Sequence, residues 1–168
     1  GLRVSDGDGG TSAPNVLTIN VTPELDGTPL AYGEEAVNTF TAGSQDTPAI
    51  ATLADGSYVI TWTSTGQDGS GDGVYAQRFS ASGVAIGPEF RVNTPTAGAQ
   101  TDTHVAALSS GGFVVVWTDQ GGTDGSSYGV YSQRYDAAGA AVGGETLVNT
   151  FTTNQQAAGS VAAYTGGY

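Results

Sequence analysis

Cysteine, methionine and lysine are all absent from this chain of 168 residues. Without cysteine the chain can form no disulfide, no thiolate nucleophile and no cysteine-ligated zinc site. Cations are scarce, because four arginines stand against 16 acidic residues and leave a net charge of −12. Such a surface repels phosphate backbones and anionic lipid. We therefore expect neither nucleic acid nor a membrane surface as a partner.

Long apolar runs are also missing, and the chain opens with no charged and then apolar leader. A helix that spans a bilayer needs about 18 or more apolar residues, so we expect no membrane insertion. Since there is no initiator methionine either, we expect the chain to be a piece of a larger protein whose export signals lie elsewhere.

Glycine, threonine, serine, alanine and valine dominate the sequence, and 27 residues are glycine. Glycine and β-branched residues weaken helices and suit short strands joined by tight turns. A hydrophobic content of 38% is enough for a modest core. The composition predicts an all-β protein.

An internal repeat organises most of the chain. The segment VNTFTAGSQ begins at Val37, returns as VNTPTAGAQ at Val92, and returns again as VNTFTTNQQ at Val148, a period of 55 and then 56 residues. Repeats of this length are supersecondary units that bury their apolar faces against like neighbours. We assign residues 34–90 to a first repeat, 91–146 to a second, and 147–168 to the incomplete start of a third.

Each full repeat predicts about four antiparallel strands. The first strand, 49–53, is followed by Asp55-Gly56, which suits a two-residue hairpin turn, and by a strand over 58–63 that ends near Trp62. A third strand runs over 74–79 and a fourth over 89–92. Both faces of the second strand are apolar, so both need a cover. Blades of a β-propeller satisfy this requirement, and so does a β-sandwich built from two repeat sheets.

Residues 1–33 do not match the repeat. They contain an SDGDGGTS loop, an alternating strand over 16–21 and a proline-bearing linker. One face of that strand needs a core that so few residues cannot provide. We therefore expect the strand to pair with the repeats or with a neighbouring molecule.

Two resemblances follow from these segments. The stretch VSDGDGGTSAPNVLTINVTPELDGTP resembles the end of cadherin-like or immunoglobulin-like adhesin repeats. The segments LADGSYVITW and LSSGGFVVVW, with GVYAQRFSASG and GVYSQRYDAAG, resemble the tandem repeats of large calcium-associated adhesins and exoproteins that bacteria secrete by the type I route. This likeness implies a secreted or cell-surface location, a calcium-rich setting, and a role in adhesion, biofilm or matrix rather than in catalysis.

Calcium prefers oxygen ligands placed closely in sharply turning loops. Asp6 and Asp8 fit this pattern best, and Asp68 with Asp72 is a second candidate. Asp124 is the counterpart of Asp68, but Tyr128 replaces the second acid in that loop. Plain turn formation explains the same residues, so calcium is a prediction with a structural alternative.

Catalytic groups are few. A serine–histidine–aspartate triad needs an imidazole, and His104 is the only histidine and aligns with Ala49 of the first repeat. A glycosidase needs two carboxylates at a set distance, whereas Glu89 and Glu145 are repeat equivalents on different units. We therefore predict no enzyme activity.

The recurring aromatic and arginine residues suit a framework better than a ligand site. Trp62 and Trp117 lie inside apolar alternating strands and are expected in the core. Arg78 and Arg134 are expected to pair with a recurring carbonyl or acid, such as Glu89 or Glu145.

The function that this sequence predicts is a noncatalytic, calcium-stabilised segment of an extracellular adhesion or matrix protein. Its partners would be neighbouring repeats or protomers, with surface glycans or matrix as further candidates. One alternative is a subunit of a self-assembling surface filament that pairs by strand addition. Another is a carbohydrate-binding module, which would need exposed aromatic side chains beside polar loops.

Overall fold

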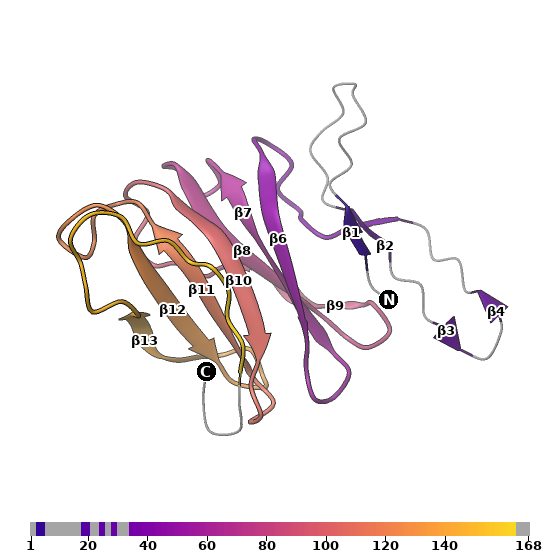
Figure 1. Cartoon of the computed structure of the whole chain (residues 1–168). Coiled ribbons are helices and arrows are strands. Elements are labelled where there is room, and N and C mark those ends of the chain that lie inside the picture. The colour runs from indigo at the N-terminus through magenta and orange to yellow at the C-terminus, as the bar shows by residue number, and fades with distance from the viewer. Residues whose placement is uncertain (1–2, 6–17, 21–23, 26–27, 30–33, 164–168) are drawn as a thin grey trace.

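The computed structural model describes residues 3–5, 18–20, 24–25, 28–29 and 34–163, and every regular element in those residues is a β-strand (Figure 1). The expectation of an all-β chain is confirmed. In the same described residues, no helix has the length and apolarity that a membrane crossing requires.

Each full repeat forms one antiparallel sheet of four strands in sequential order. The strands of the first sheet are β6 (Gln45–Thr52), β7 (Tyr58–Thr65), β8 (Asp72–Phe79) and β9 (Ala85–Arg91). Those of the second sheet are β10 (Gln100–Ala107), β11 (Phe113–Asp119), β12 (Gly129–Tyr135) and β13 (Ala141–Leu147). The four-stranded unit predicted from the repeat is therefore confirmed.

Strand bounds and one turn differ from the sequence prediction. β6 begins at Gln45, because a bulge between Asp46 and Ala49 carries the strand past Pro48. The hairpin that follows is longer than two residues: the Leu53 amide donates to the Ser57 carbonyl over 2.7 Å. Gly56 takes the expected positive φ, 83°. The Asp-Gly signal thus located the turn correctly and gave the wrong loop length.

The two sheets pack face to face, with the first on the right of Figure 1 and the second on the left. The first sheet contributes aliphatic side chains to the shared core, namely Leu53, Val59, Val74, Ala76 and Val92. The second contributes mainly aromatic ones, namely Phe113, Val115, Trp117, Tyr131 and Tyr135. Trp117 is 1% exposed and Val59 and Val74 are fully buried, so this interface is the main core of the described chain.

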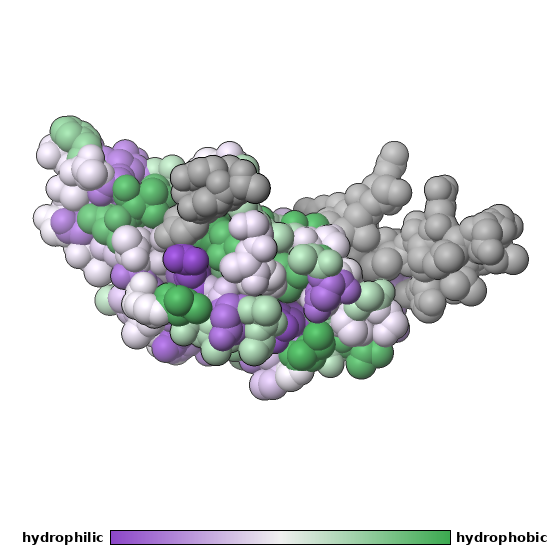
Figure 2. Space-filling model, turned by 90° about the horizontal axis from the view of Figure 1, so that it is seen from below, coloured by the Kyte–Doolittle hydropathy of each residue, from purple (hydrophilic) through white to green (hydrophobic). Residues whose placement is uncertain are grey.

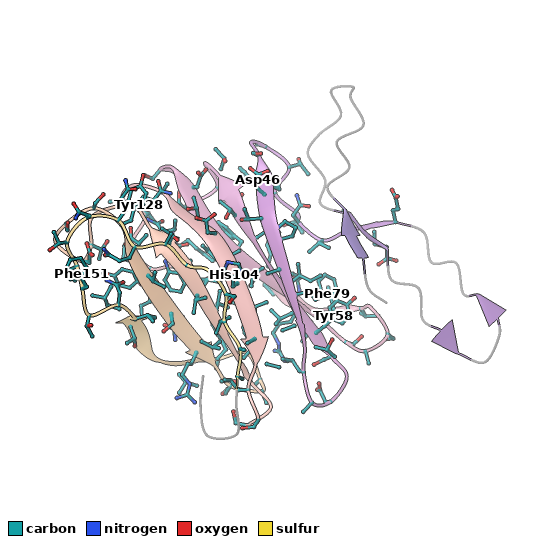
Figure 3. All side chains as sticks on the ribbon, in the orientation of Figure 1. Asp46, Tyr58, Phe79, His104, Tyr128 and Phe151 are labelled. Atoms are coloured by element: carbon teal, nitrogen blue, oxygen red, sulfur yellow. The ribbon has the colours of Figure 1, made fainter. Side chains whose placement is uncertain are left out.

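The sheets stack head to tail, because unlike faces of equivalent units meet. The first sheet has the same aromatic face as the second, but that face points away from the interface. It forms a second core cluster with Val37, and its members are Ile60, Trp62, Tyr75 and Phe79 with the partly buried Ile50 and Tyr58. Tyr58 and Phe79 stack at 5.1 Å between ring centroids (Figure 3).

This arrangement of two stacked sheets fits the sandwich that was the alternative prediction. The described residues contain two sheets of this size, and these two close no ring. A propeller therefore stays a prediction. The expected core positions of Trp62 and Trp117 are confirmed, since their side chains are 0% and 1% exposed.

The leading segment takes part in two small sheets, one of which includes a strand from the start of the first repeat. β2 (Thr18–Asn20) pairs with β1 (Arg3–Ser5) on one side and with β5 (Glu35–Ala36) on the other. β3 (Glu24–Leu25) pairs with β4 (Thr28–Pro29). The predicted strand over 16–21 thus has partners within the chain, although residues 16, 17 and 21 lie outside the described residues.

Candidate functional site

The junction between consecutive repeats is held by the asparagine of each VNT opening. Asn93, which is 2% exposed, accepts a hydrogen bond from the Val74 amide at 2.8 Å. Its Nδ2 donates to the Pro95 carbonyl at 2.7 Å and to Gln100 Oε1 at 2.9 Å. One amide side chain therefore joins the third strand of the first repeat to the opening of the second.

The same clamp recurs at the next junction. Asn149 Oδ1 accepts from the Val130 amide at 2.7 Å, and Asn149 Nδ2 donates to the Phe151 carbonyl at 2.8 Å. Gln156 then stands where Gln100 stands in the earlier copy, at 3.3 Å from Asn149 Nδ2. The sequence marked these residues as a repeat, but their role was not predicted, because partners 19 residues apart leave no local pattern.

We expect Asn93→Ala to destabilise the fold by ~2–3 kcal/mol, because the substitution leaves the buried Val74 amide and the Gln100 amide oxygen without this partner. Asn149→Ala is the matched control: it removes equivalent bonds at a more exposed position, where water can replace them, and should cost ~1 kcal/mol or less. Urea unfolding followed by circular dichroism measures both. Equal losses for the two variants would contradict the clamp.

Two further contacts link the repeats directly. Thr103 Oγ1 donates to Thr61 Oγ1 at 3.2 Å inside the shared core. The Arg78 guanidinium donates to the carbonyls of Ala137 and Ala138, with Nη2 at 2.8 Å from the Ala137 oxygen. The carbonyl partner predicted for Arg78 is therefore confirmed.

Glu89 and Glu145 serve their own repeats and are not the partners of Arg78. Glu89 Oε2 accepts from the Thr39 amide at 2.6 Å, and Glu89 Oε1 accepts from Gln67 Nε2 at 2.5 Å. Glu145 Oε1 accepts from the Thr94 amide in the same way. Each glutamate thus ties the last strand of a repeat back to its VNT opening, a framework role in both copies.

The acidic loops after β7 and β11 hold the predicted metal ligands. Asp68 Oδ1 accepts from the Ser70 amide at 3.0 Å, and Asp124 Oδ1 accepts from the Ser126 amide at 3.0 Å. Both are turn-forming bonds, as the structural alternative predicts. Asp72 Oδ1 accepts from Thr65 Oγ1 at 2.6 Å.

One oxygen in each loop is left over. Asp68 Oδ2 and Asp124 Oδ2 are buried and have no hydrogen-bond partner. Within the described residues, however, no group of three or more histidine, aspartate or glutamate side chains could hold a metal ion. A calcium ion at Asp68 and Asp72 would therefore need backbone carbonyls or water for most of its ligands. Asp6 and Asp8 lie outside the described residues.

The sequence did not single out a buried carboxylate at the end of β11. Asp119 is 2% exposed, and its Oδ1 accepts from the Gly121 amide at 2.6 Å and lies 3.5 Å from Gln100 Nε2. The first repeat has Ser64 at this position. Because the two copies differ here, the repeat pattern gave no signal for it.

His104 lies in β10, opposite Val116 across the strand pair, and is partly buried (Figure 3). Its repeat equivalent is Ala49, which occupies the same place in β6. The position is thus a strand position in both copies, and no bond joins the imidazole to an acid among the contacts of the described residues.

Burial raises the pKa of four tyrosines above the ordinary value near 10, and the shift is largest at Tyr135, where Glu145 adds to it. The others are Tyr58, Tyr75 and Tyr131. A raised folded-state pKa favours the neutral phenol. Its stabilisation is therefore complete below the pKa of the unfolded chain and is lost as pH rises from about 10 toward the folded-state values.

We expect unfolding at alkaline pH to accompany ionisation of these tyrosines, since burial disfavours each phenolate and the charge of Arg91 near Tyr75 offsets only part of that cost. Absorbance of tyrosinate and the circular dichroism of the strands should change together above about pH 10. Tyr135→Phe removes the most shifted group and should move the alkaline midpoint upward. Ionisation of all tyrosines near pH 10 in a chain that stays folded would contradict this expectation.

Comparisons with known proteins identify no family for this chain. No family model matches the sequence, and no curated protein matches it. Among solved structures, an endo-arabinase from Bacteroides thetaiotaomicron is similar, with a TM-score of 0.48 and 15% identity over 82% of this chain and 53% of its own. The chain thus spans about half the length of that enzyme, and at this TM-score the likeness carries no functional argument.

Proposed function

We propose that the chain is a noncatalytic structural segment of an extracellular bacterial adhesion or matrix protein. The observation that supports this most is the use of the recurring polar residues. The asparagine, glutamine and glutamate of each repeat, and Arg78 of the first, bind backbone groups of their own or a neighbouring repeat. The repeated chemistry is therefore the chemistry of a scaffold in series.

The surface supports the same role. A net charge of −12 keeps the chain soluble and disfavours anionic partners. The tryptophans are buried and offer no stacking platform for a sugar ring. A carbohydrate-binding role would thus rest on other residues, such as Phe151, which is 65% exposed.

Adhesion is tested with beads that carry the folded chain. They should be retained on bacterial cells or on their extracellular matrix several-fold more than beads that carry a doubly substituted Trp62→Asp, Trp117→Asp chain, which cannot keep its cores. Equal retention of the two beads would reject the adhesion role. Hydrolysis of a polysaccharide or peptide by the folded chain alone would reject the noncatalytic assignment.

Calcium binding by the acidic loops is part of this proposal, supported by the unpartnered oxygens of Asp68 and Asp124. Calcium at about ten times its Kd should raise the free energy of unfolding by ~1.4 kcal/mol, because it binds the folded state preferentially. Asp68→Asn with Asp124→Asn should reduce the rise. If calcium still raises the free energy of unfolding of this variant by the full amount, calcium binds at other residues. If calcium does not raise the free energy of unfolding of the unsubstituted chain, calcium is no part of the proposal.

A filament subunit is a second candidate, favoured by one observation. Residues 156–163 lie on the second sheet without joining a sheet of their own among the described residues. An unpaired extended segment is a template for an added strand. A chain that stays monomeric in sedimentation across a wide concentration range would rule this candidate out.

A further inference from the structure

The outer face of the second sheet, which points away from the first, is covered over one half. Ala106, Leu108, Val114 and Val116 form a third core cluster there. The cover is the C-terminal segment, whose Ala158, Val161 and Ala163 pack against that cluster. Figure 1 shows this segment as the yellow trace that runs across the second sheet.

This segment is the counterpart of β10. Counted from the VNT openings, Gln156 aligns with Gln100, and Val161 and Ala163 align with Val105 and Ala107. Val105 and Ala107 pack against the core that the first and second sheets share. Val161 and Ala163 pack in the same way against the third core cluster, on the outer face of the second sheet. Residues 156–163 therefore lie where the first strand of a third sheet belongs.

The other half of the face remains open. Val148 is 50% exposed, whereas its equivalents Val92 and Val37 are 5% and 7% exposed. Val130 is partly exposed, whereas its equivalent Val74 is fully buried. The difference arises because the aromatic face of the second sheet covers Val74 and Val92, and no described element does so for Val130 and Val148.

Apolar surface continues beyond these valines. Phe151 is 65% exposed and lies at the left end of the molecule in Figure 3. Figure 2 shows hydrophobic groups gathered at that end, where Figure 1 places β12 and β13. Neighbouring exposed apolar residues of this kind mark a contact surface.

We infer that this open half is the docking site for three further strands of a third repeat, joined covalently after Tyr168. The occupant is a copy of the β11–β13 type, and its Phe-x-Val-x-Trp face would cover Val130 and Val148. Three features support it: the stacked interface repeats one unit further, the Asn149 clamp is made, and the sequence Tyr-Thr-Gly-Gly-Tyr at 164–168 resembles the Leu-Ser-Ser-Gly-Gly-Phe that leads into β11.

This inference rests on the stacking in series that the proposed function uses, but it is tested without any adhesion measurement. The chain has no cysteine, so a single introduced thiol reports the exposure of one site. The extended protein is the full chain followed by a second copy of residues 114–147. The join is set by the sequence Gly-Gly-Tyr at 166–168, which matches Gly-Gly-Phe at 111–113 once the third copy is counted as one residue shorter after Ala163. Maleimide labelling of Val148→Cys is compared in the full chain and in the extended chain.

Labelling of Val148→Cys should slow by at least ~10-fold in the extended chain, since the site would then react only after local opening. Val92→Cys, already 5% exposed, should be slow in both chains. An extension whose added copy carries Val115→Asp and Trp117→Ser should leave Val148→Cys fast. The intact extension without any thiol should also unfold several degrees higher than the full chain.

Unchanged labelling of Val148→Cys in a folded extended chain would overturn the inference, and so would an unchanged or lower melting temperature. Protection of Val148→Cys that grows with the concentration of the unextended chain would also overturn it, because a second copy would then be the occupant. Equal retention in the bead assay would reject the adhesion role, but it would not alter the labelling rates of Val148→Cys, so the two proposals can fail separately.

Discussion

Val92→Asp should destabilise the chain by at least ~3 kcal/mol, because it places a carboxylate without a partner between the two sheets. Val92 is 5% exposed and belongs to the shared core. Its amide donates to the Val74 carbonyl at 2.8 Å, so the backbone holds the side chain in place. Urea unfolding followed by circular dichroism measures the loss.

The matched control is Val148→Asp. Val148 makes the same backbone bond, to the Val130 carbonyl at 2.7 Å, but its side chain is 50% exposed. A surface substitution of this kind changes stability by ~0.5 kcal/mol or less. Similar losses for the two variants would show that burial at the repeat junction does not decide the stability of this position.

Trp117→Ala should cost ~3–5 kcal/mol, since it opens a cavity in the core that both sheets share. Trp117 is 1% exposed and lies 6.3 Å from the ring of Tyr131, with which it stacks. Because the cavity adjoins Val59 and Val74 of the first sheet, both sheets should lose stability together.

Trp62 then serves as the reporter, since it is the one tryptophan that remains and it belongs to the first repeat. In Trp117→Ala its fluorescence and the circular dichroism of the whole chain should shift to lower urea by the same amount. A first repeat that unfolds at its original urea concentration, after the second has unfolded, would contradict a shared core. Trp117→Phe removes less volume and should cost less than Trp117→Ala.

Much of the fold follows from the sequence because the repeat is visible in it. Alternation over 58–63 and 113–117 predicts buried strands, and the matched positions of Trp62 and Trp117 predict equal roles, which their burial confirms. The turn at Gly56 also follows from the sequence, because few residues other than glycine adopt its positive φ.

The direction of stacking could not be predicted, because both faces of each middle strand are apolar. Val59 and Ile60 look equally suited to an interface, yet Val59 meets the second repeat and Ile60 faces the other way. The choice depends on contacts between residues that are more than 50 positions apart, which no local pattern records.

The hydrogen-bond partners of the recurring polar side chains could not be predicted from the sequence either. Asn93 bonds to a strand 19 residues earlier, and Arg78 bonds to a turn about 60 residues later. The bulges at Thr47 and Asp102, whose φ angles are 48° and 52°, displaced the predicted start of each first strand. Such features follow from the packed sheet and not from the propensities of the residues that carry them.

The head-to-tail contact of the two sheets is tested most directly by a cross-link between them. Thr61 and Thr103 approach to 3.2 Å between hydroxyl oxygens, within reach of a disulfide, and the natural chain has no cysteine to compete. Mild oxidation of Thr61→Cys, Thr103→Cys should give a cross-linked monomer in high yield. Thr61→Cys, Thr118→Cys should not, because Thr118 lies on the opposite face of the second sheet. Absence of the first cross-link, or equal yields of the two, would contradict the stacked arrangement.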